Sequence, residues 1–331
     1  MKRYGHSVVI GKFYPPHRGH KHLIDTALSR SDRVSVIVVQ KTGQRIPGEL
    51  RAAWLREIHP RAEVLLIEQG NLADDDSRGW AAATIGWIGK PDAAFTSESY
   101  GEPWTRAMGC DHVLVDMERA RVPISGTKVR ENPLAAWEFL EPPVRAHFAK
   151  RVVALGAEST GTTTLTRALA ERYGTVWAPE YGRHYAEGKY ASPDRTWRTD
   201  EFVHIAEAQH ALAGRLARSA DRVVFSDTDA LATAVWHERY VGTRTPEVEA
   251  FAAAHRPDLY LLTGDEIPFE QDGLRDGEHL RHWMHGRFEE VLAAQPVPYV
   301  VLRGSREERL RAACEAVDRV LEGVQSERVI A

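Results

Sequence analysis

Short apolar runs rich in β-branched residues recur along the chain, and each is followed by a segment with helical spacing. In the first part of the chain the runs cover residues 7–10, 34–39, 64–67, 93–95 and 112–115. Unbroken apolar runs that alternate with helices are typical of a parallel sheet covered by helices on both faces. The pattern therefore predicts a doubly wound α/β fold, with ligands at the carboxyl ends of the strands.

The alternation is interrupted once and then restarts. Asn132-Pro133 and Glu141-Pro142-Pro143 flank a short Trp-containing helical segment, and prolines disfavour helix in the residue before them. Apolar runs then return at 151–155, 223–225, 259–262 and 299–302. A chain of 331 residues is also long for one core. We therefore predict two domains, 1–131 and 151–331, joined by a linker at 132–150.

Composition and charge limit the partners of this chain. The net charge is −4, which gives no electrostatic footprint for nucleic acid. No stretch approaches 18 apolar residues, so no membrane segment is expected. The two cysteines form no CxxC pair, which suits a reducing cytosol. We expect a cytoplasmic protein with small-molecule partners; the sequence leaves open whether it forms a homo-oligomer.

Two segments of the first part are suited to binding phosphate. His17-x-Gly19-His20 stands directly before a helical segment, whose N-terminus carries a partial positive charge. Gly19 has no Cβ, so the backbone there is expected to come close to a ligand. Residues 124–130 read ISGTKVR, in which Ser125 and Thr127 offer hydroxyls and Arg130 a fixed cation.

The first part of the chain resembles the HxGH nucleotidyltransferases, and more closely the nicotinamide mononucleotide adenylyltransferase domain of the NadR-type family. The resemblance is carried by GKFYPPHRGH at 11–20, TSE at 96–98, LVD at 114–116 and ISGTKVRENP at 124–133. It implies a Rossmann-like fold and adenylyl transfer from ATP to nicotinamide mononucleotide, which gives NAD and pyrophosphate.

The same resemblance assigns roles to individual residues. Catalytic contacts to the phosphates would come from His17, His20 and Arg130, and further contacts to ATP from Gly11, Phe13, Gly19, Ser125 and Thr127. Trp80 would lie near the nicotinamide ring, where an aromatic face can stack on a cationic pyridinium. Mg²⁺ would arrive with ATP, and no tightly bound organic cofactor is expected.

A second phosphate site is predicted at residues 156–165, which read GAESTGTTTL. The two glycines have the spacing of the G-x-x-x-x-G-K-[ST] loop, but Thr162 stands at the lysine position. Glycines and small hydroxyl residues can still direct backbone N–H groups at a phosphate. Thr163 stands at the position of the Mg²⁺ ligand.

Three downstream segments support this second site. WAPEYGR at 177–183 follows a short strand, VVFSDTD at 223–229 ends a strand in carboxylates, and 272–287 is rich in arginine and histidine, as in a mobile lid. A carboxylate at such a strand end can hold the water shell of Mg²⁺. The second part of the chain resembles the ribosylnicotinamide kinase domain of the NadR-type family, which has a P-loop kinase-like α/β fold. The resemblance is carried, in chain order, by the loop at 156–165 and by the segments EYGR, DTD and DGLR.

This second resemblance implies phosphorylation of the 5′-hydroxyl of nicotinamide riboside by ATP. The riboside would be bound by Glu180, Tyr181, Arg183 and Asp229. Asp227 would be catalytic and would hold Mg²⁺ together with Thr163. The resemblance also allows Asp229, in place of Asp227, to hold Mg²⁺ or to orient the hydroxyl. ATP would be bound by the loop and lid residues Gly156, Glu158, Ser159, Gly161, Thr162, Thr163, Thr164 and Arg275.

Thr162 departs from the family pattern and leaves the activity of this domain open. Losing one preorganised donor to a transferring phosphoryl group costs about 10²–10³ in rate. One candidate to replace the lysine is Lys189. Better candidates are Arg183, Arg275 and Arg281, because a guanidinium can bind phosphate in a bidentate manner. One alternative is a sensor in which the second domain binds ATP or riboside without turnover. Another is adenylyl transfer to a different phosphorylated acceptor, for instance phosphopantetheine.

Overall fold

The computed structural model describes residues 2–191, 193–273, 275 and 277–323. The chain divides into two compact units, residues 1–144 and 145–331. The division falls within segment 132–150, which contains two short helical elements, η1 (Trp137–Phe139) and α6 (Pro142–Phe148). None of the described helices is both long and apolar enough to cross a bilayer.

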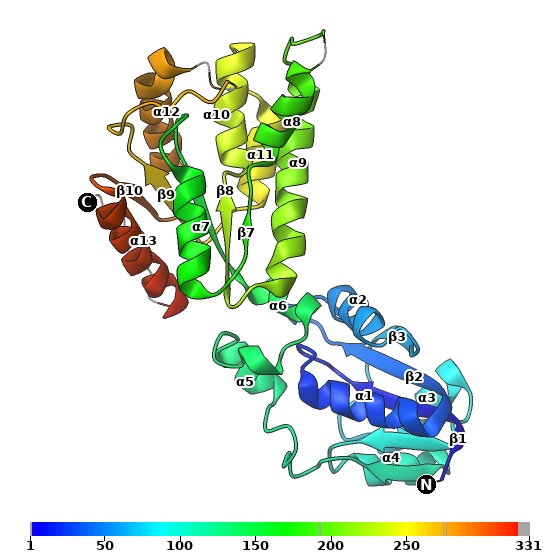
Figure 1. Cartoon of the computed structure of the whole chain (residues 1–331). Helices are drawn as coiled ribbons and strands as arrows, with labels where there is room; N and C mark the ends of the chain where they lie inside the picture. Colours follow the sequence, from blue (N-terminus) through cyan, green and yellow to red (C-terminus); the bar gives the residue numbers. More distant parts are fainter. Residues whose placement is uncertain (1, 192, 274, 276, 324–331) are drawn as a thin grey trace. The chain divides into compact units, whose positions relative to one another are not determined.

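Strands and helices alternate in the first unit (Figure 1). Besides η1 and the start of α6, its elements are β1 (Tyr4–Gly11), α1 (Arg18–Arg30), β2 (Ser31–Gln40), α2 (Gly48–Ile58), β3 (Glu63–Glu68), α3 (Ser77–Ile88), β4 (Ala93–Thr96), α4 (Gly101–Met108), β5 (Asp111–Leu114) and α5 (Gly126–Glu131). The strands form a parallel sheet in the order β3-β2-β1-β4-β5. The strand order therefore reverses beside β1, where doubly wound folds bind ligands.

Helices cover both faces of this sheet. Leu23 and Ile24 of α1 and Leu55 of α2 pack on one face, and Trp104 and Met108 of α4 pack with α3 on the other. The central strands β1, β2 and β4 are largely buried on both sides, which explains why their sequences contain continuous apolar runs rather than alternating ones. The predicted Rossmann-like α/β fold is confirmed for this unit.

The second unit repeats this architecture with longer helices. After α6 its elements are β6 (Lys150–Leu155), α7 (Thr162–Tyr173), β7 (Trp177–Ala178), α8 (Tyr181–Tyr190), α9 (Thr199–Leu216), η2 (Ala217–Ser219), β8 (Val223–Asp227), α10 (Ala230–Val241), α11 (Pro246–Ala254), β9 (Leu259–Thr263), η3 (Glu278–Leu280), α12 (Arg281–Ala293), β10 (Tyr299–Leu302) and α13 (Arg306–Leu321). Its parallel sheet has the order β10-β9-β6-β8-β7.

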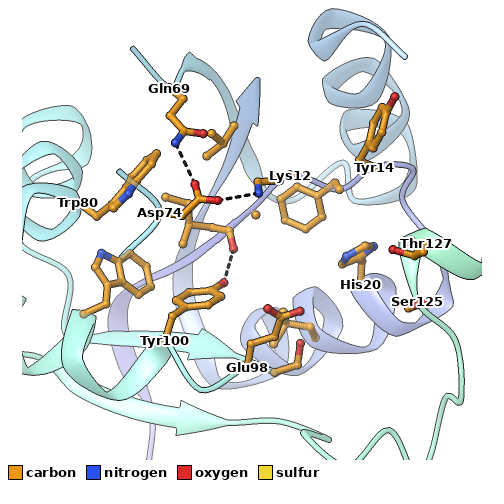
Figure 2. A pocket seen from close by; sticks show the side chains of 18 of the residues that line it. Lys12, Tyr14, His20, Gln69, Asp74, Trp80, Glu98, Tyr100, Ser125 and Thr127 are labelled. Atoms are coloured by element: carbon orange, nitrogen blue, oxygen red, sulfur yellow. Dashed lines mark hydrogen bonds and ion pairs between the residues drawn. The ribbon is translucent and has the colours of Figure 1, made fainter. Parts of the chain in front are cut away.

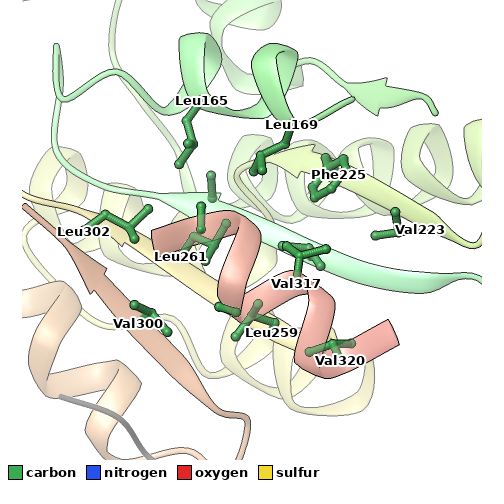
Figure 3. Packing of buried hydrophobic residues seen from close by; sticks show 14 of the residues in the cluster. Leu165, Leu169, Val223, Phe225, Leu259, Leu261, Val300, Leu302, Val317 and Val320 are labelled. Atoms are coloured by element: carbon green, nitrogen blue, oxygen red, sulfur yellow. The ribbon is translucent and has the colours of Figure 1, made fainter. Parts of the chain in front are cut away.

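The sheet of the second unit is also enclosed by helices. Figure 3 shows Leu165 and Leu169 of α7 and Val317 and Val320 of α13 in one hydrophobic cluster with strand residues such as Phe225. On the opposite face α10 and α12 pack against β6, β9 and β10. This packing fixes the carboxyl ends of β6 and β8 side by side, with Ala154 paired to Asp227.

The predicted mobile lid at 272–287 needs correction. Residues 274 and 276 lie outside the described residues, but from Arg281 onward the segment is α12. Met284, Phe288 and Leu292 recur every four residues and are fully buried against the sheet. A helix with that buried stripe is part of the core, because removing its apolar face from the sheet would expose all three side chains to water.

Candidate functional sites

A cavity of about 570 Å³ opens at the carboxyl ends of β1 and β4 in the first unit. Of the residues predicted for the adenylyl-transfer site, seven line it: Gly11, Phe13, His20, Trp80, Ser125, Thr127 and Arg130. In Figure 2, Trp80 and Asp74 lie at one end of the cavity, and His20, Ser125 and Thr127 at the other. The cavity thus has an aromatic end and an end suited to phosphate.

His17 and His20 are paired at the N-terminus of α1. Their rings stack with centroids 3.7 Å apart, and each Nδ1 accepts a hydrogen bond from the backbone N–H of the other residue, at 3.4 and 3.3 Å. Burial, with help from Arg119, lowers the pKa of His17 to about 4. Burial, then His17 and Arg119, also lowers the pKa of His20 well below its usual value. Without a ligand both rings are therefore neutral at pH 7.

Gly19 and His17 do not line the main cavity, although the sequence predicts that both contact ATP. A Cβ on Gly19 would lie 3.0 Å from Cε1 of His17, so this glycine makes room for the imidazole rather than for a ligand. His17 and Gly19 line a smaller adjoining cavity of about 70 Å³, which shares His20 with the main cavity. His17 thus supports the ring of His20 from behind.

Polar groups from distant loops meet at the phosphate end. Ser125 caps α5, its hydroxyl accepting from the N–H of Lys128 at 3.3 Å, and Arg130 donates to the hydroxyl of Thr127 at 3.0 Å. Arg119 lines both cavities and was not found by sequence reasoning, because it lies on an irregular loop outside the motif. The phosphate end therefore has two cations, Arg119 and Arg130.

The aromatic end is rigidly held. The indole N–H of Trp80 donates to the backbone oxygen of Ala73 at 2.8 Å. Asp74 accepts from Lys41 at 2.7 Å, Gln69 at 2.9 Å and Lys12 at 3.3 Å. The hydrogen bond from Lys41, followed by those from Gln69 and Lys12, lowers the pKa of Asp74 to about 2. This network anchors the loop before α3 and so positions Trp80.

In the second unit a cavity of about 180 Å³ lies over the loop between β6 and α7. Ten of the predicted residues line it: Gly156, Glu158, Ser159, Gly161, Thr162, Thr163, Thr164, Glu180, Arg183 and Arg275. Gly161 has a φ of 89°, in the left-handed region that favours glycine. The backbone therefore makes a left-handed turn at Gly161, directly before α7 begins at Thr162.

Two buried side chains fix the loop from below and from the side. Arg309 of α13 donates to the carbonyl oxygen of Thr160 at 3.0 Å and to Glu266 at 2.6 Å. Glu158, predicted to contact ATP, turns its carboxylate away, accepting from Arg239 at 2.7 Å and from the N–H of Gly277 at 2.8 Å. Neither Arg239 nor Arg309 belongs to the recognised motifs, so sequence reasoning missed both.

Asp227 lies at the end of β8 directly beside the loop. It is 1% exposed, its Oδ2 accepts a short hydrogen bond from the hydroxyl of Thr163, and its Oδ1 has no hydrogen-bond partner among the described residues. Burial raises the pKa of Asp227, and the hydroxyls of Thr163 and Thr162 oppose this rise. A carboxylate beside a threonine hydroxyl offers the oxygen ligands that Mg²⁺ prefers in proteins. No group of three or more acidic, histidine or cysteine side chains within the described residues forms a metal cluster.

Glu180 faces the same cavity from the start of α8. Its partial burial, followed by the repulsion of Asp227, raises the pKa of Glu180 to about 8, while Arg183 lowers it. Gln209 of α9 links the start of α8, next to Glu180, to the end of β8 at Asp227. Its Oε1 accepts from the N–H of Tyr181 at 2.7 Å, and its Nε2 donates to the backbone oxygen of Asp227 at 3.4 Å.

The raised pKa of Glu180 predicts a pH-dependent stability. Its pKa in the unfolded chain is near 4.5 and in the folded chain about 8, so the folded state binds more protons between these values. The free energy of unfolding should therefore fall as pH rises from about 5 to 8. Thermal unfolding of the full chain between pH 5 and 9 should show a shallower decline for Glu180→Gln, which would be the more stable protein above pH 8. An equal slope in both proteins would contradict the assignment.

The rest of this cavity is an aromatic pocket that sequence motifs did not reveal. Its five aromatic residues come from α8, α9, α10 and the segment before α9: Tyr190, Trp197, Phe202, Trp236 and Tyr240. The ring centroids of Trp197 lie 5.1 Å from Phe202 and 5.4 Å from Tyr240. The indole N–H groups of Trp197 and Trp236 are buried and find no acceptor among the described residues.

Five of the candidate residues do not line this cavity: Tyr181, Lys189, Asp227, which lies beside the loop, Asp229 and Arg281. Asp229 is the N-cap of α10, its Oδ1 accepting from Leu231 and Ala232 and its Oδ2 from the hydroxyl of Tyr260 at 2.7 Å. Tyr181 lines a separate surface depression. Lys189 is buried in an ion pair with Glu201, with Nζ–O distances of 2.8 and 3.0 Å. Asp229 and Tyr181 thus lie outside the lining of this cavity, and the ammonium of Lys189 is paired with Glu201 instead of facing the loop.

The folds and the two cavities define a nucleotide-binding α/β protein whose second unit is P-loop kinase-like. A family model described as an AAA domain matches residues 151–309 of this second unit. The chain belongs to the NadR family, a family of NAD biosynthesis. It is 32% identical over 293 residues to the trifunctional NAD biosynthesis/regulator protein NadR of Escherichia coli (strain K12), covering 81% of this chain and 71% of the relative. The protein of that name from Salmonella typhimurium is 30% identical over 290 residues, with the same coverage.

Solved structures agree with this assignment. A crystal structure of a NadR protein in complex with NR superposes with a TM-score of 0.79 at 27% identity, over 100% of both chains. A NadR protein in complex with NAD and AMP-PNP gives a TM-score of 0.74 at 25% identity, over 100% of this chain and 99% of the other. The predicted combination of a Rossmann-like unit and a P-loop kinase-like unit is thereby confirmed.

Proposed function

We propose that this protein makes NAD in two steps, one in each unit: phosphorylation of nicotinamide riboside, then adenylyl transfer to the resulting mononucleotide. The observation that carries the proposal is the shared design of the two cavities. Each joins a phosphate-binding helix start to an aromatic end, with Trp80 in the first unit and Trp197 and Trp236 in the second. A nicotinamide nucleotide combines the same two chemical features, phosphate and a cationic ring.

In the first unit, an oxygen of the mononucleotide phosphate would attack the α-phosphorus of ATP as the bond to pyrophosphate breaks. The side chains need only align the reactants and stabilise charge on the phosphates, without a covalent intermediate. His20 and Thr127 lie where they can donate to phosphate oxygens, and Arg119 and Arg130 can balance the charge of the leaving pyrophosphate. Phosphate binding beside the neutral His20 would raise its pKa from the lowered value of the ligand-free protein.

In the second unit, the riboside 5′-hydroxyl oxygen would bond to the γ-phosphorus of ATP while the bond to the β-phosphate oxygen breaks and ADP leaves. Oδ1 of Asp227, buried and without a partner among the described residues, would accept the hydroxyl proton. Mg²⁺ bound with ATP would be held by Thr163 and Oδ2 of Asp227 and would neutralise charge on the β- and γ-phosphates.

The nicotinamide ring would occupy the aromatic ends. A cationic pyridinium over an aromatic face gains about 1–2 kcal/mol, which corresponds to roughly a tenfold change in affinity. The unpartnered indole N–H groups of Trp197 and Trp236 can donate to the carboxamide oxygen.

Replacing Trp80 should weaken mononucleotide binding selectively. Trp80→Leu keeps apolar volume but removes the aromatic face, so the KM for nicotinamide mononucleotide should rise about tenfold while the KM for ATP stays unchanged. Trp87→Leu is the matched control, since Trp87 lies on the same helix and packs against Trp80 without lining the cavity. Equal effects of the two substitutions on the mononucleotide KM would show that Trp80 serves only the core.

Thr162 favours a second candidate function, in which the second unit binds nucleotide or riboside as a sensor without turnover. Chromatography of products separates the candidates. Full-length protein with Mg-ATP and nicotinamide mononucleotide should give NAD and pyrophosphate, and with nicotinamide riboside should give the mononucleotide and ADP in the first turnovers. Riboside binding without ADP formation would refute the kinase and support the sensor.

A further inference from the structure

The charge that Thr162 lacks has to come from elsewhere if the second unit handles ATP. Among the described residues that line this cavity, the basic side chains are Arg183 and Arg275. Arg183 comes from α8 on one side of the cavity, and Arg275 from the segment between β9 and α12 on another. These two guanidiniums reach the cavity from separate elements.

The other cations near the loop have structural partners. Arg281 donates to the carbonyl oxygen of Ile267 at 2.9 Å and lies 5.7 Å from the ring centroid of Phe269. Arg309 is buried beneath the loop on carbonyl oxygens and Glu266, and Arg239 is buried on Glu158. None of the three lines the cavity.

A single carboxylate joins the two cavity cations. Oδ2 of Asp272 lies 2.8 Å from Nη2 of Arg183 and 3.3 Å from Nε of Arg275. Arg275 also lies on the loop itself, with Nη1 3.4 Å from the hydroxyl oxygen of Ser159. Asp272 therefore holds both guanidiniums together at the loop.

Both cations also act on the acidic groups of the site. The positive charges of Arg183 and Arg275 lower the pKa of Glu180, against the burial that raises it, and Arg183 lowers that of Asp227 in the same way. These positive charges therefore act on Glu180 and Asp227, the two carboxylates that the site brings together. A guanidinium has five N–H donors, so a bridge to one carboxylate oxygen leaves donors on each arginine for phosphate oxygens.

We infer that Arg183 and Arg275, held together by Asp272, replace the loop lysine and bind the β- and γ-phosphates of ATP. The inference rests on one part of the proposed function, the binding of ATP by the second unit. It reassigns Arg183 from riboside binding to phosphate binding. Two guanidiniums can bind phosphate in a bidentate manner, so the pair supplies more directional contacts than one ammonium would.

The test restores the lysine and asks whether the arginines become dispensable. Arg275→Ala and Arg183→Ala should each lower kcat for riboside phosphorylation about 100-fold, as for loss of one transition-state donor. In proteins that also carry Thr162→Lys, the same substitutions should cost less than about tenfold. Arg244→Ala is the matched control, because Arg244 forms an exposed ion pair with Glu249 and does not line the cavity.

Binding distinguishes failure of this inference from failure of the kinase assignment. With NAD present to occupy the first unit, calorimetric titration with Mg-AMP-PNP should show about tenfold weaker binding for Arg275→Ala and recovery in the double variant with Thr162→Lys. If the wild-type protein does not phosphorylate riboside but shows this pattern, the kinase assignment fails and the inference stands. Equal losses with and without Thr162→Lys, in turnover and in binding, would overturn the inference.

Discussion

His20→Asn should lower kcat for adenylyl transfer about 10²–10³-fold and leave riboside phosphorylation unchanged. The ring of His20 lines the cavity at the start of α1, where a donor to the α-phosphate is needed. Loss of one such preorganised donor costs about 2.7–4 kcal/mol. Asparagine retains an acceptor for the backbone N–H of His17, so the helix cap is kept while the far ring nitrogen is lost.

The measurement is NAD formation from the mononucleotide under saturating substrates, with thermal unfolding of the same protein. His184→Asn is a suitable control, since the side chain of His184 is 81% exposed in the second unit. An adenylyl-transfer rate within about threefold of wild type for His20→Asn would exclude His20 from the reaction. A fall in both activities would instead indicate a folding defect.

Asp227→Asn should abolish riboside phosphorylation, with a loss of at least about 10³ in kcat, and leave adenylyl transfer intact. The substitution keeps the shape of the side chain and an oxygen for the hydroxyl of Thr163, but it removes the charge and the proton acceptor. Loss of a general base alone costs about 10²–10⁴. The weakened hold on Mg²⁺ adds to this loss.

The assay is ADP release that depends on riboside. The matched control is Asp258→Asn, at the opposite end of the same sheet, where Asp258 accepts from Lys150 and from the N–H of Arg151. Riboside phosphorylation by Asp227→Asn within tenfold of wild type would contradict the mechanism. Loss in both variants would indicate that the second unit tolerates neither change structurally.

The sheets and the phosphate loops were predictable because short, contiguous signals determine them. Each buried strand is a continuous apolar run, and Thr162 begins α7 directly after the glycine with a φ of 89°. The helical stripe of Met284, Phe288 and Leu292 was also present in the sequence and, read alone, predicts a core helix instead of a lid. Asp229 likewise stands at the start of a helical segment, where aspartate is a preferred N-cap.

The substrate ends could not be predicted in the same way. Trp197, Phe202 and Trp236 meet only through packing of α9 and α10, and no local pattern records that meeting. Tyr181 and Arg183 are two positions apart at the start of one helix, so they point in different directions and only one reaches the cavity. The bridge from Arg183 to Asp272 spans a sequence separation that no motif covers.

The central claim is that one chain carries a riboside to NAD through two phosphate sites. The direct measurement is a single reaction of pure protein with Mg-ATP and nicotinamide riboside, in which NAD, ADP and pyrophosphate are quantified together. Two successive steps require one ADP and one pyrophosphate for each NAD formed. A different result would contradict the claim: no ADP from the riboside, with NAD and pyrophosphate formed only when the mononucleotide is supplied. The second unit would then be a binding module.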